Sequence, residues 1–167
     1  MANKKISELD PVISLEDTDL VPVVTDLDTT PKSNKITWAS LKSLLAALKV
    51  STVQQYCVEW GTELAVKDGV GYIEIPAECN GMNLISARAR VGTAGTTNAS
   101  TFNIYNVTDS HSMLSSAISI ASGATSGTGT VDTAHDDVAT GDIIRIDCDG
   151  ISTTPPKGLI VTLSFRL

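Results

Sequence analysis

The chain has 167 residues and a formal net charge of −7 at pH 7. An acidic chain with no basic stripe lacks the cations that neutralise nucleic-acid phosphates, so we do not expect a nucleic-acid-binding protein. No apolar run approaches the ~20 residues that span a bilayer, and residues 1–5 lead into polar sequence instead of a signal-peptide core. Membrane insertion is therefore not expected either.

Residues 1–36 contain two short apolar stretches among acids and prolines. The first includes Ile6 and Leu9, and the second is Leu20-Val21-Pro22-Val23-Val24. Pro22 has no backbone N–H to donate, which restricts the second stretch to an edge strand or an exposed extended segment. A segment of this size buries too little surface to be very stable alone. We expect it to become ordered by docking.

Residues 37–48 have the spacing of an amphipathic helix. Trp38, Leu41, Leu45 and Leu48 recur at helical intervals and so share one face. Thr37 can cap this helix by accepting an unpaired backbone N–H of the first turn. So short a helix is marginal in water, and its apolar face must dock on something. The preceding residues, another copy of the helix and a larger assembly are the three alternatives.

Three short motifs in this region resemble the N-terminal segment of tailed-bacteriophage fibre, spike and related virion proteins. They are Lys5-Ile6-Ser7-Glu8-Leu9, Asp19-Leu20-Val21-Pro22-Val23-Val24 and Lys35-Ile36-Thr37-Trp38-Ala39-Ser40-Leu41. The resemblance implies a virion anchor, commonly trimeric, that attaches a distal domain to the particle. An ordinary β-hairpin followed by a helix is the alternative. The residues expected to form the attachment or oligomer contacts are Ile6, Leu9, Leu20, Val21, Val23, Trp38, Leu41, Leu45 and Leu48.

Residues 56–167 have the period-two pattern of β-strands, and the polar residues 49–55 before them indicate a linker. The last strand is the clearest, because apolar residues occupy every second position from Leu159 to Leu167; we predict that it is central and buried. In residues 85–91 the odd positions are apolar, which predicts that they face the core.

About eight short strands with no helical period between them indicate an antiparallel β-sandwich or jelly roll. The predicted fold is thus mainly β. A small N-terminal arm, residues 1–48, ends in one short α-helix over 37–48; residues 49–55 are a linker, and residues 56–167 form a β-sandwich or jelly-roll-like domain.

Three cysteines, Cys57, Cys79 and Cys148, lie far apart in the sequence. Their odd number and the absence of a CxxC pair indicate neither a disulfide framework nor a zinc site. We expect free, partly buried thiols, as in a protein made in a cytosol.

Two acidic clusters could bind cations. Asp147-Cys148-Asp149-Gly150 resembles the start of a calcium loop, but the bidentate Glu that completes such a loop does not follow. His135-Asp136-Asp137 could bind a cation or orient an imidazole. Its partner histidine would have to be His111, which is far off in the sequence, so a polar turn is preferred. No metal and no cofactor are predicted.

No catalytic constellation is recognisable. A GxSxG nucleophile elbow is absent, and the carboxylate separation that glycoside cleavage requires is a three-dimensional property. We predict no catalytic residue. Loops over 92–100, 109–112 and 123–129 carry small hydroxyl-bearing residues that suit weak sugar contact and equally suit ordinary turns. The residues predicted for surface contact are Thr96, Asn98, His111, Thr125 and Thr128.

The sequence thus leads us to expect a non-enzymatic structural component of a phage virion, such as a fibre, spike or decoration protein. The expected partners are two further copies in a homotrimer, other virion proteins bound through the N-terminal arm, and a host-surface glycan. It would be located in the virion after assembly in the bacterial cytoplasm. The alternative is a soluble carbohydrate-binding β-sandwich module.

Overall fold

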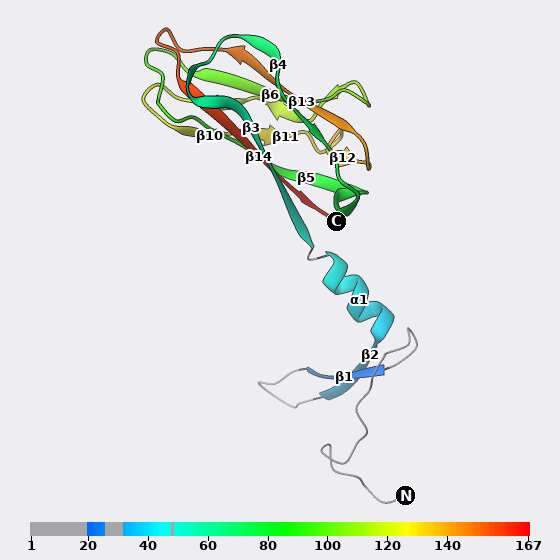
Figure 1. Ribbon diagram of the computed structural model, residues 1–167. Helices are drawn as coiled ribbons and strands as arrows, with labels where there is room; N and C mark the ends of the chain where they lie inside the picture. The colour runs from blue at the N-terminus through cyan, green and yellow to red at the C-terminus, as the bar shows by residue number, and fades with distance from the viewer. Residues whose placement is uncertain (1–19, 26–31, 48) are drawn as a thin grey trace, which may run out of the picture. The chain divides into compact units, whose positions relative to one another are not determined.

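The computed structural model describes residues 20–25, 32–47 and 49–167 (Figure 1). The chain divides into two compact units, residues 1–48 and 49–167. In the first unit, β1 (Leu20–Thr25) pairs antiparallel with β2 (Lys32–Thr37), and β2 leads directly into α1 (Trp38–Ala47). The short helix therefore lies where the sequence predicts it.

Helix α1 also begins with the predicted cap. The Ser40 backbone N–H donates a hydrogen bond to Thr37 Oγ1 at 3.1 Å, and the two hydroxyl oxygens lie 2.8 Å apart. This contact satisfies one of the backbone donors that the first turn of a helix leaves unpaired. The helix start is thus fixed by a threonine that ends the preceding strand.

In residues 49–167, all of which the structure describes, two five-stranded antiparallel sheets face each other as a sandwich (Figure 1). The first sheet has the order β3–β14–β5–β10, with β12 also paired to β5: β3 (Val50–Glu63), β14 (Lys157–Arg166), β5 (Met82–Arg90), β10 (Ser126–Thr128) and β12 (Asp137–Val138). The second has the order β4–β13–β6–β7, with β9 also paired to β6: β4 (Lys67–Glu74), β13 (Ile143–Gly150), β6 (Ser100–Asn106), β7 (His111–Ser112) and β9 (Ile118–Ile120). A 3₁₀ helix at Ala77–Cys79 and a ribbon of β8 (Leu114–Ser116) with β11 (Thr130–Val131) complete the unit.

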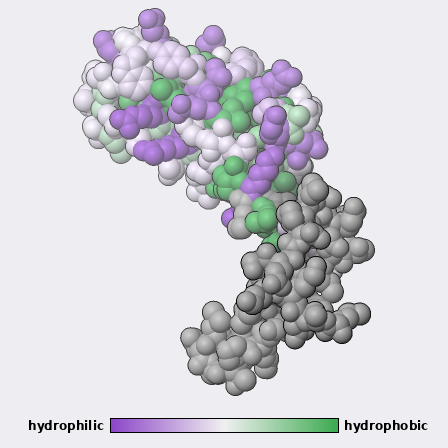
Figure 2. Space-filling model, turned by 60° about the horizontal axis from the view of Figure 1, so that its bottom comes forward, coloured by the Kyte–Doolittle hydropathy of each residue, from purple (hydrophilic) through white to green (hydrophobic). Residues whose placement is uncertain are grey.

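The core lies between the two sheets, and β14 contributes most regularly to it. Leu159, Val161, Leu163 and Phe165 are all 0% exposed, because alternate residues of a strand point to the same face. Strand β14 pairs with β3 on one side and β5 on the other, so the prediction of a central, buried last strand is confirmed. Leu167 differs: it lies beyond the strand and is 59% exposed. Figure 2 shows hydrophilic residues and residues of intermediate hydropathy over most of the visible face of this unit, with hydrophobic residues in small patches.

The inward pattern predicted for residues 85–91 is wrong at its first position. Ile85 is 40% exposed, whereas Ala87, Ala89 and Val91 are buried. The pairing of β5 with β14 slips at this point, so that Ile85 is an extra residue with no partner opposite it. A β-bulge of this kind turns one side chain outward without disturbing those that follow.

The predicted linker, residues 49–55, is also a misassignment, because Val50 already begins β3 and residues 50–55 pair with β14. Thr52 and Gln54 are exposed on the outer side of this edge strand, whereas Ser51 and Gln55 lie on its inner side. Thr52 and Ser164 bring their hydroxyl oxygens to 3.3 Å. Inward-facing residues of the same stretch are only partly buried.

The cysteines are free thiols, as the sequence predicts. Cys79 and Cys148 are 0% exposed, and Cys57 is half-buried. Burial raises the pKa of the Cys57 thiol to about 12 and that of the Cys148 thiol to about 11, the negative charge of Asp149 adding to the second effect. Little thiolate forms at neutral pH, so these residues behave as small core side chains.

The second unit has two ends. Val50, where β3 begins, pairs with Arg166, and we call this the proximal end; β5 and β13 also begin here. At the opposite, distal end β5 finishes at Arg90 and β14 begins at Lys157. The loops over residues 92–99 and 151–156 lie there (Figure 1).

Because Leu163 is fully buried in the central strand, its truncation should be costly. We expect Leu163→Ala to lower the free energy of unfolding by about 2–5 kcal/mol, measured by urea denaturation. Leu167→Ala is the matched control, since the same side chain is 59% exposed there, and its effect should stay within about 0.5 kcal/mol. Equal effects of the two substitutions would contradict this account of the core.

Candidate functional site

Helix α1 carries an apolar face that is largely exposed. Trp38 and Leu41 are partly exposed, whereas Leu44 and Leu45 are 57% and 55% exposed. Trp38, Leu41 and Leu45 are members of the predicted attachment set; Leu44 was not predicted. Apolar area on a helix this short favours contact with another surface that removes it from water.

Of the other six predicted attachment residues, three lie in strand β1 and three lie outside the described part of the chain. Leu20, Val21 and Val23 lie in β1, where the register sets Val21 opposite Ile36 and Val23 opposite Asn34 of β2. The hairpin thus places them on a short two-stranded ladder immediately before α1. The remaining predicted residues lie outside the described part of the chain: Ile6, Leu9 and Leu48.

Two of the predicted surface-contact residues lie together at the distal end. The backbone groups of Thr96 and Thr154 exchange hydrogen bonds of 3.2 Å in both directions. The Ser152 hydroxyl donates to the Asn98 carbonyl at 3.1 Å. The distal loops are therefore held to one another by hydrogen bonds, as befits loops that present side chains from a rigid scaffold.

The segment predicted as a flexible turn over residues 123–129 contains a strand. Thr125 is exposed just before β10, and Thr128 lies within β10, opposite Arg88 of β5. A Cβ at Gly127 would collide with the carbonyl of Ser119, so glycine is needed here for close backbone approach. The glycines that suggested flexibility thus include one that allows packing.

His111, the last predicted contact residue, lies at the proximal end, away from the others. Its ring stacks on that of His135, with ring centroids 4.3 Å apart and planes inclined by 28°. The two rings line a hollow of about 350 Å³ together with residues that include Asp109 and Asp137. His111 is far from His135 in the sequence, but the fold brings the two imidazole rings into contact.

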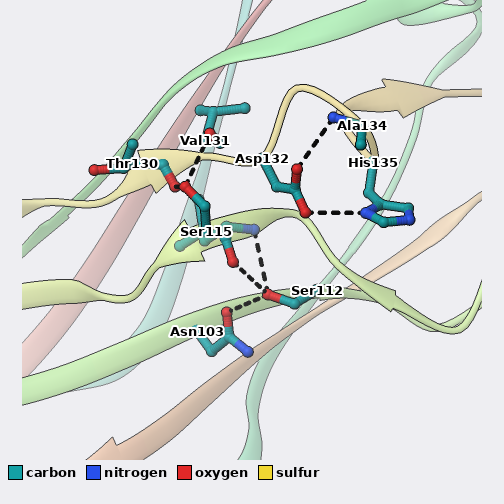
Figure 3. Close-up of polar contacts among 9 residues, drawn as sticks. Asn103, Ser112, Ser115, Thr130, Val131, Asp132, Ala134 and His135 are labelled. Atoms are coloured by element: carbon teal, nitrogen blue, oxygen red, sulfur yellow. Dashed lines mark hydrogen bonds and ion pairs between the residues drawn. The ribbon is translucent and has the colours of Figure 1, made fainter.

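A tight turn positions the His135 imidazole (Figure 3). Asp132 Oδ2 lies 2.9 Å from His135 Nδ1, and Asp132 Oδ1 accepts the Ala134 backbone N–H at 3.1 Å. The His135 backbone N–H donates to the Asp132 carbonyl at 3.0 Å. The hydrogen bond with His135 lowers the pKa of the Asp132 carboxyl, and the Ala134 N–H and the nearby histidine charges lower it further.

Asn106, a buried residue that lines the same hollow, bonds to the polar groups around it. Asn106, which is 2% exposed, donates from Nδ2 to Asp109 Oδ2 at 2.8 Å and to Asp142 Oδ2 at 3.1 Å. Its Oδ1 accepts the Thr108 backbone N–H at 3.1 Å. Because the Asn106 amide finds hydrogen-bond partners on both its nitrogen and its oxygen, this polar part of the hollow's lining is held in place.

The arrangement does not pair a nucleophile with a base. The Ser112 hydroxyl, drawn in Figure 3, donates to Asn103 Oδ1 at 2.8 Å and accepts the Leu114 N–H at 3.2 Å. In residues 49–167 no hydroxyl or thiol forms a hydrogen bond with either histidine. Within the described residues no group of three His, Cys, Asp or Glu side chains could hold a metal ion.

The Asp147–Gly150 cluster is bonded within the protein. Arg145 donates to both Asp147 carboxylate oxygens, at 2.7 and 2.9 Å, and the Gly69 N–H donates to Oδ1 at 2.8 Å. Burial, followed by repulsion from Asp147 and Asp68, raises the pKa of Asp149. Cys148 points into the core. The carboxylate of Asp147 thus serves Arg145, whose guanidinium also lies 4.9 Å from the centroid of the Tyr105 ring.

No protein-family model, curated protein or solved structure matches the chain at a significant level. Among the described residues, no helix has the length and apolarity needed to cross a membrane.

The lowered pKa of Asp132 gives stability a definite pH dependence. A carboxylate whose folded pKa is depressed stabilises fully above its unfolded pKa, about 3.9, and loses this contribution as the pH falls through the folded value. We expect Asp132→Asn to lower the melting temperature at pH 7 and the difference from the wild type to shrink towards pH 3. Asp136→Asn is the control, because the neighbouring carboxylate makes no hydrogen bond among the described residues. Two results would contradict this stabilising role of the Asp132 carboxylate. One is an equal drop in melting temperature in both variants, and the other is a difference between Asp132→Asn and the wild type that grows as the pH falls.

Proposed function

We propose that the protein is a non-enzymatic structural component of a phage virion, in which residues 1–48 attach the chain and residues 49–167 form a displayed β unit. The observation that carries the proposal is the exposed apolar face of α1, whose first turn belongs to the last of the motifs that resemble phage virion anchors. The division of the chain between Leu48 and Lys49 supports it, because the attachment segment and the β unit are separate compact units.

Self-association into a trimer is part of the proposal. Leu41, Leu44 and Leu45 lie close together in sequence on a helix of ten residues, too short to be stable alone. Three copies that pack these leucines against one another would form a short coiled-coil contact. Rotational symmetry would then give the attachment segment one repeated interface.

The β unit suits display. Successive strands move between the two sheets, and in each sheet the order alternates early and late strands: β3–β14–β5–β10 and β4–β13–β6–β7. We interpret this order as a jelly roll. The chain enters the unit at the proximal end, so the loops that carry Thr96, Asn98 and Thr125 are at the end opposite the attachment point of the chain. That position favours contact with a host surface.

A carbohydrate-binding module without a virion role is the second candidate. Exposed aromatic rings favour it, since Tyr56, Trp60 and Tyr72 are 52%, 43% and 55% exposed and such rings can stack on sugars. Such a module would bind glycans without needing residues 1–48, which distinguishes it from the leading proposal.

Charges placed on the apolar face of α1 should block assembly. We expect the full-length double variant Leu41→Glu/Leu45→Glu to be lost from purified phage particles, because two carboxylates cannot be buried in the contact without a large desolvation cost. Quantitative mass spectrometry of the particles gives the occupancy. Ser43→Glu, at an exposed polar position of the same helix, should be incorporated normally. Full occupancy of the leucine variant would refute the proposal.

A further inference from the structure

The outer face of the β3–β14–β5–β10 sheet has an unusual charge distribution for an acidic protein. No carboxylate occurs at the paired positions 52–56, 160–164, 86–90 and 126–128, although the chain has 19 acidic and 12 basic residues. The charged residues within these four segments are Arg88 and Arg90, and both are exposed. This part of the sheet therefore presents positive charge alone.

The pleat of β5 sends both guanidinium groups to the same side. Ala87 and Ala89 are 0% exposed and point into the core, so Arg88 and Arg90 point outward, about 7 Å apart along the strand. Within the described residues neither arginine forms an ion pair with a carboxylate. Arg145 on the other sheet differs, because Asp147 neutralises it.

Neighbouring strands surround the two arginines with groups that suit a sugar. Arg90 lies in one row with Ile160 and Tyr56, and Arg88 lies in the next row with Thr162 and Gln54. The Tyr56 ring is 52% exposed, and its hydroxyl is held by the Trp60 N–H at 2.7 Å, which limits the ring's motion. The Arg88 guanidinium is oriented by the Ser126 hydroxyl at 3.3 Å.

These groups match an anionic polymer that also has sugar rings. A guanidinium forms paired hydrogen bonds with a carboxylate, an exposed tyrosine offers an apolar surface for stacking, and the Thr and Gln side chains can bond hydroxyl groups. Nucleic acid fits less well, because two arginines neutralise few phosphates and the net charge of −7 repels a polyanion at longer range.

We propose that this face, centred on Arg88, Arg90 and Tyr56, binds an acidic polysaccharide through the carboxylates of its sugar residues. The inference rests on the proposed display function, of which it names the ligand class and the binding surface. It moves the glycan contact from the loops at the distal end to the side of the sandwich. Each site alone would bind weakly, and several copies on one particle would raise the avidity.

Biolayer interferometry with the full-length chain tests the inference, with polygalacturonate as the carboxylated probe, dextran as the neutral one and polyphosphate as the phosphate one. We expect salt-sensitive binding to polygalacturonate and none to dextran. Arg88→Gln/Arg90→Gln should weaken binding roughly tenfold or more, because two charge-assisted contacts are lost. The control Lys67→Gln/Arg166→Gln removes the same charge at two other exposed positions and should bind as the wild type does.

Three results would overturn the inference: no binding of the wild type to polygalacturonate, equal losses in the two double variants, or preference for polyphosphate. Occupancy in particles separates this inference from the proposed function. A chain that assembles into particles but does not bind polygalacturonate refutes the polysaccharide site alone. A chain that binds through the two arginines but is missing from particles refutes the virion role alone.

Discussion

The pairing of β14 with a strand on each side is the constraint on which the β unit depends. This strand joins β3 to β5, and its inward residues fill the space between the two sheets. Because a strand alternates its side chains, the burial of Leu159, Val161, Leu163 and Phe165 obliges Ile160, Thr162 and Ser164 to face outward. The core and the outer face are thus set by one pattern.

Helix α1 differs from the sandwich, because much of its apolar surface is exposed. The sandwich hides its apolar residues within one chain, whereas the helix is too short to do so and leaves Leu44 and Leu45 more than half exposed. The chain thus combines one unit that buries its apolar residues with one that leaves some of them exposed. The proposed virion role follows from that contrast together with the motif resemblance.

The sequence predicted the features that depend on local pattern. The alternation from Leu159 onward and the Thr37 cap with its helix are local, and both are found in the structure. Sequence-based prediction failed for features that depend on how strands distant in the sequence pair in the fold. Residues 49–55 are rich in polar side chains, yet residues 50–55 form an edge strand in which Thr52 and Gln54 are exposed, and the bulge at Ile85 depends on the register with β14. The contact of His111 with His135 joins strand β7 to a turn that is distant in the chain, so no sequence spacing could indicate it.

In the proposed trimer the helix, and not the sandwich, holds copies of the chain together. The most direct test is the solution mass, measured by light scattering after size exclusion, of the full chain and of residues 49–167, the second compact unit. We expect a trimer for the full chain and a monomer for residues 49–167. A monomeric full chain, or a trimer that persists without residues 1–48, would contradict it.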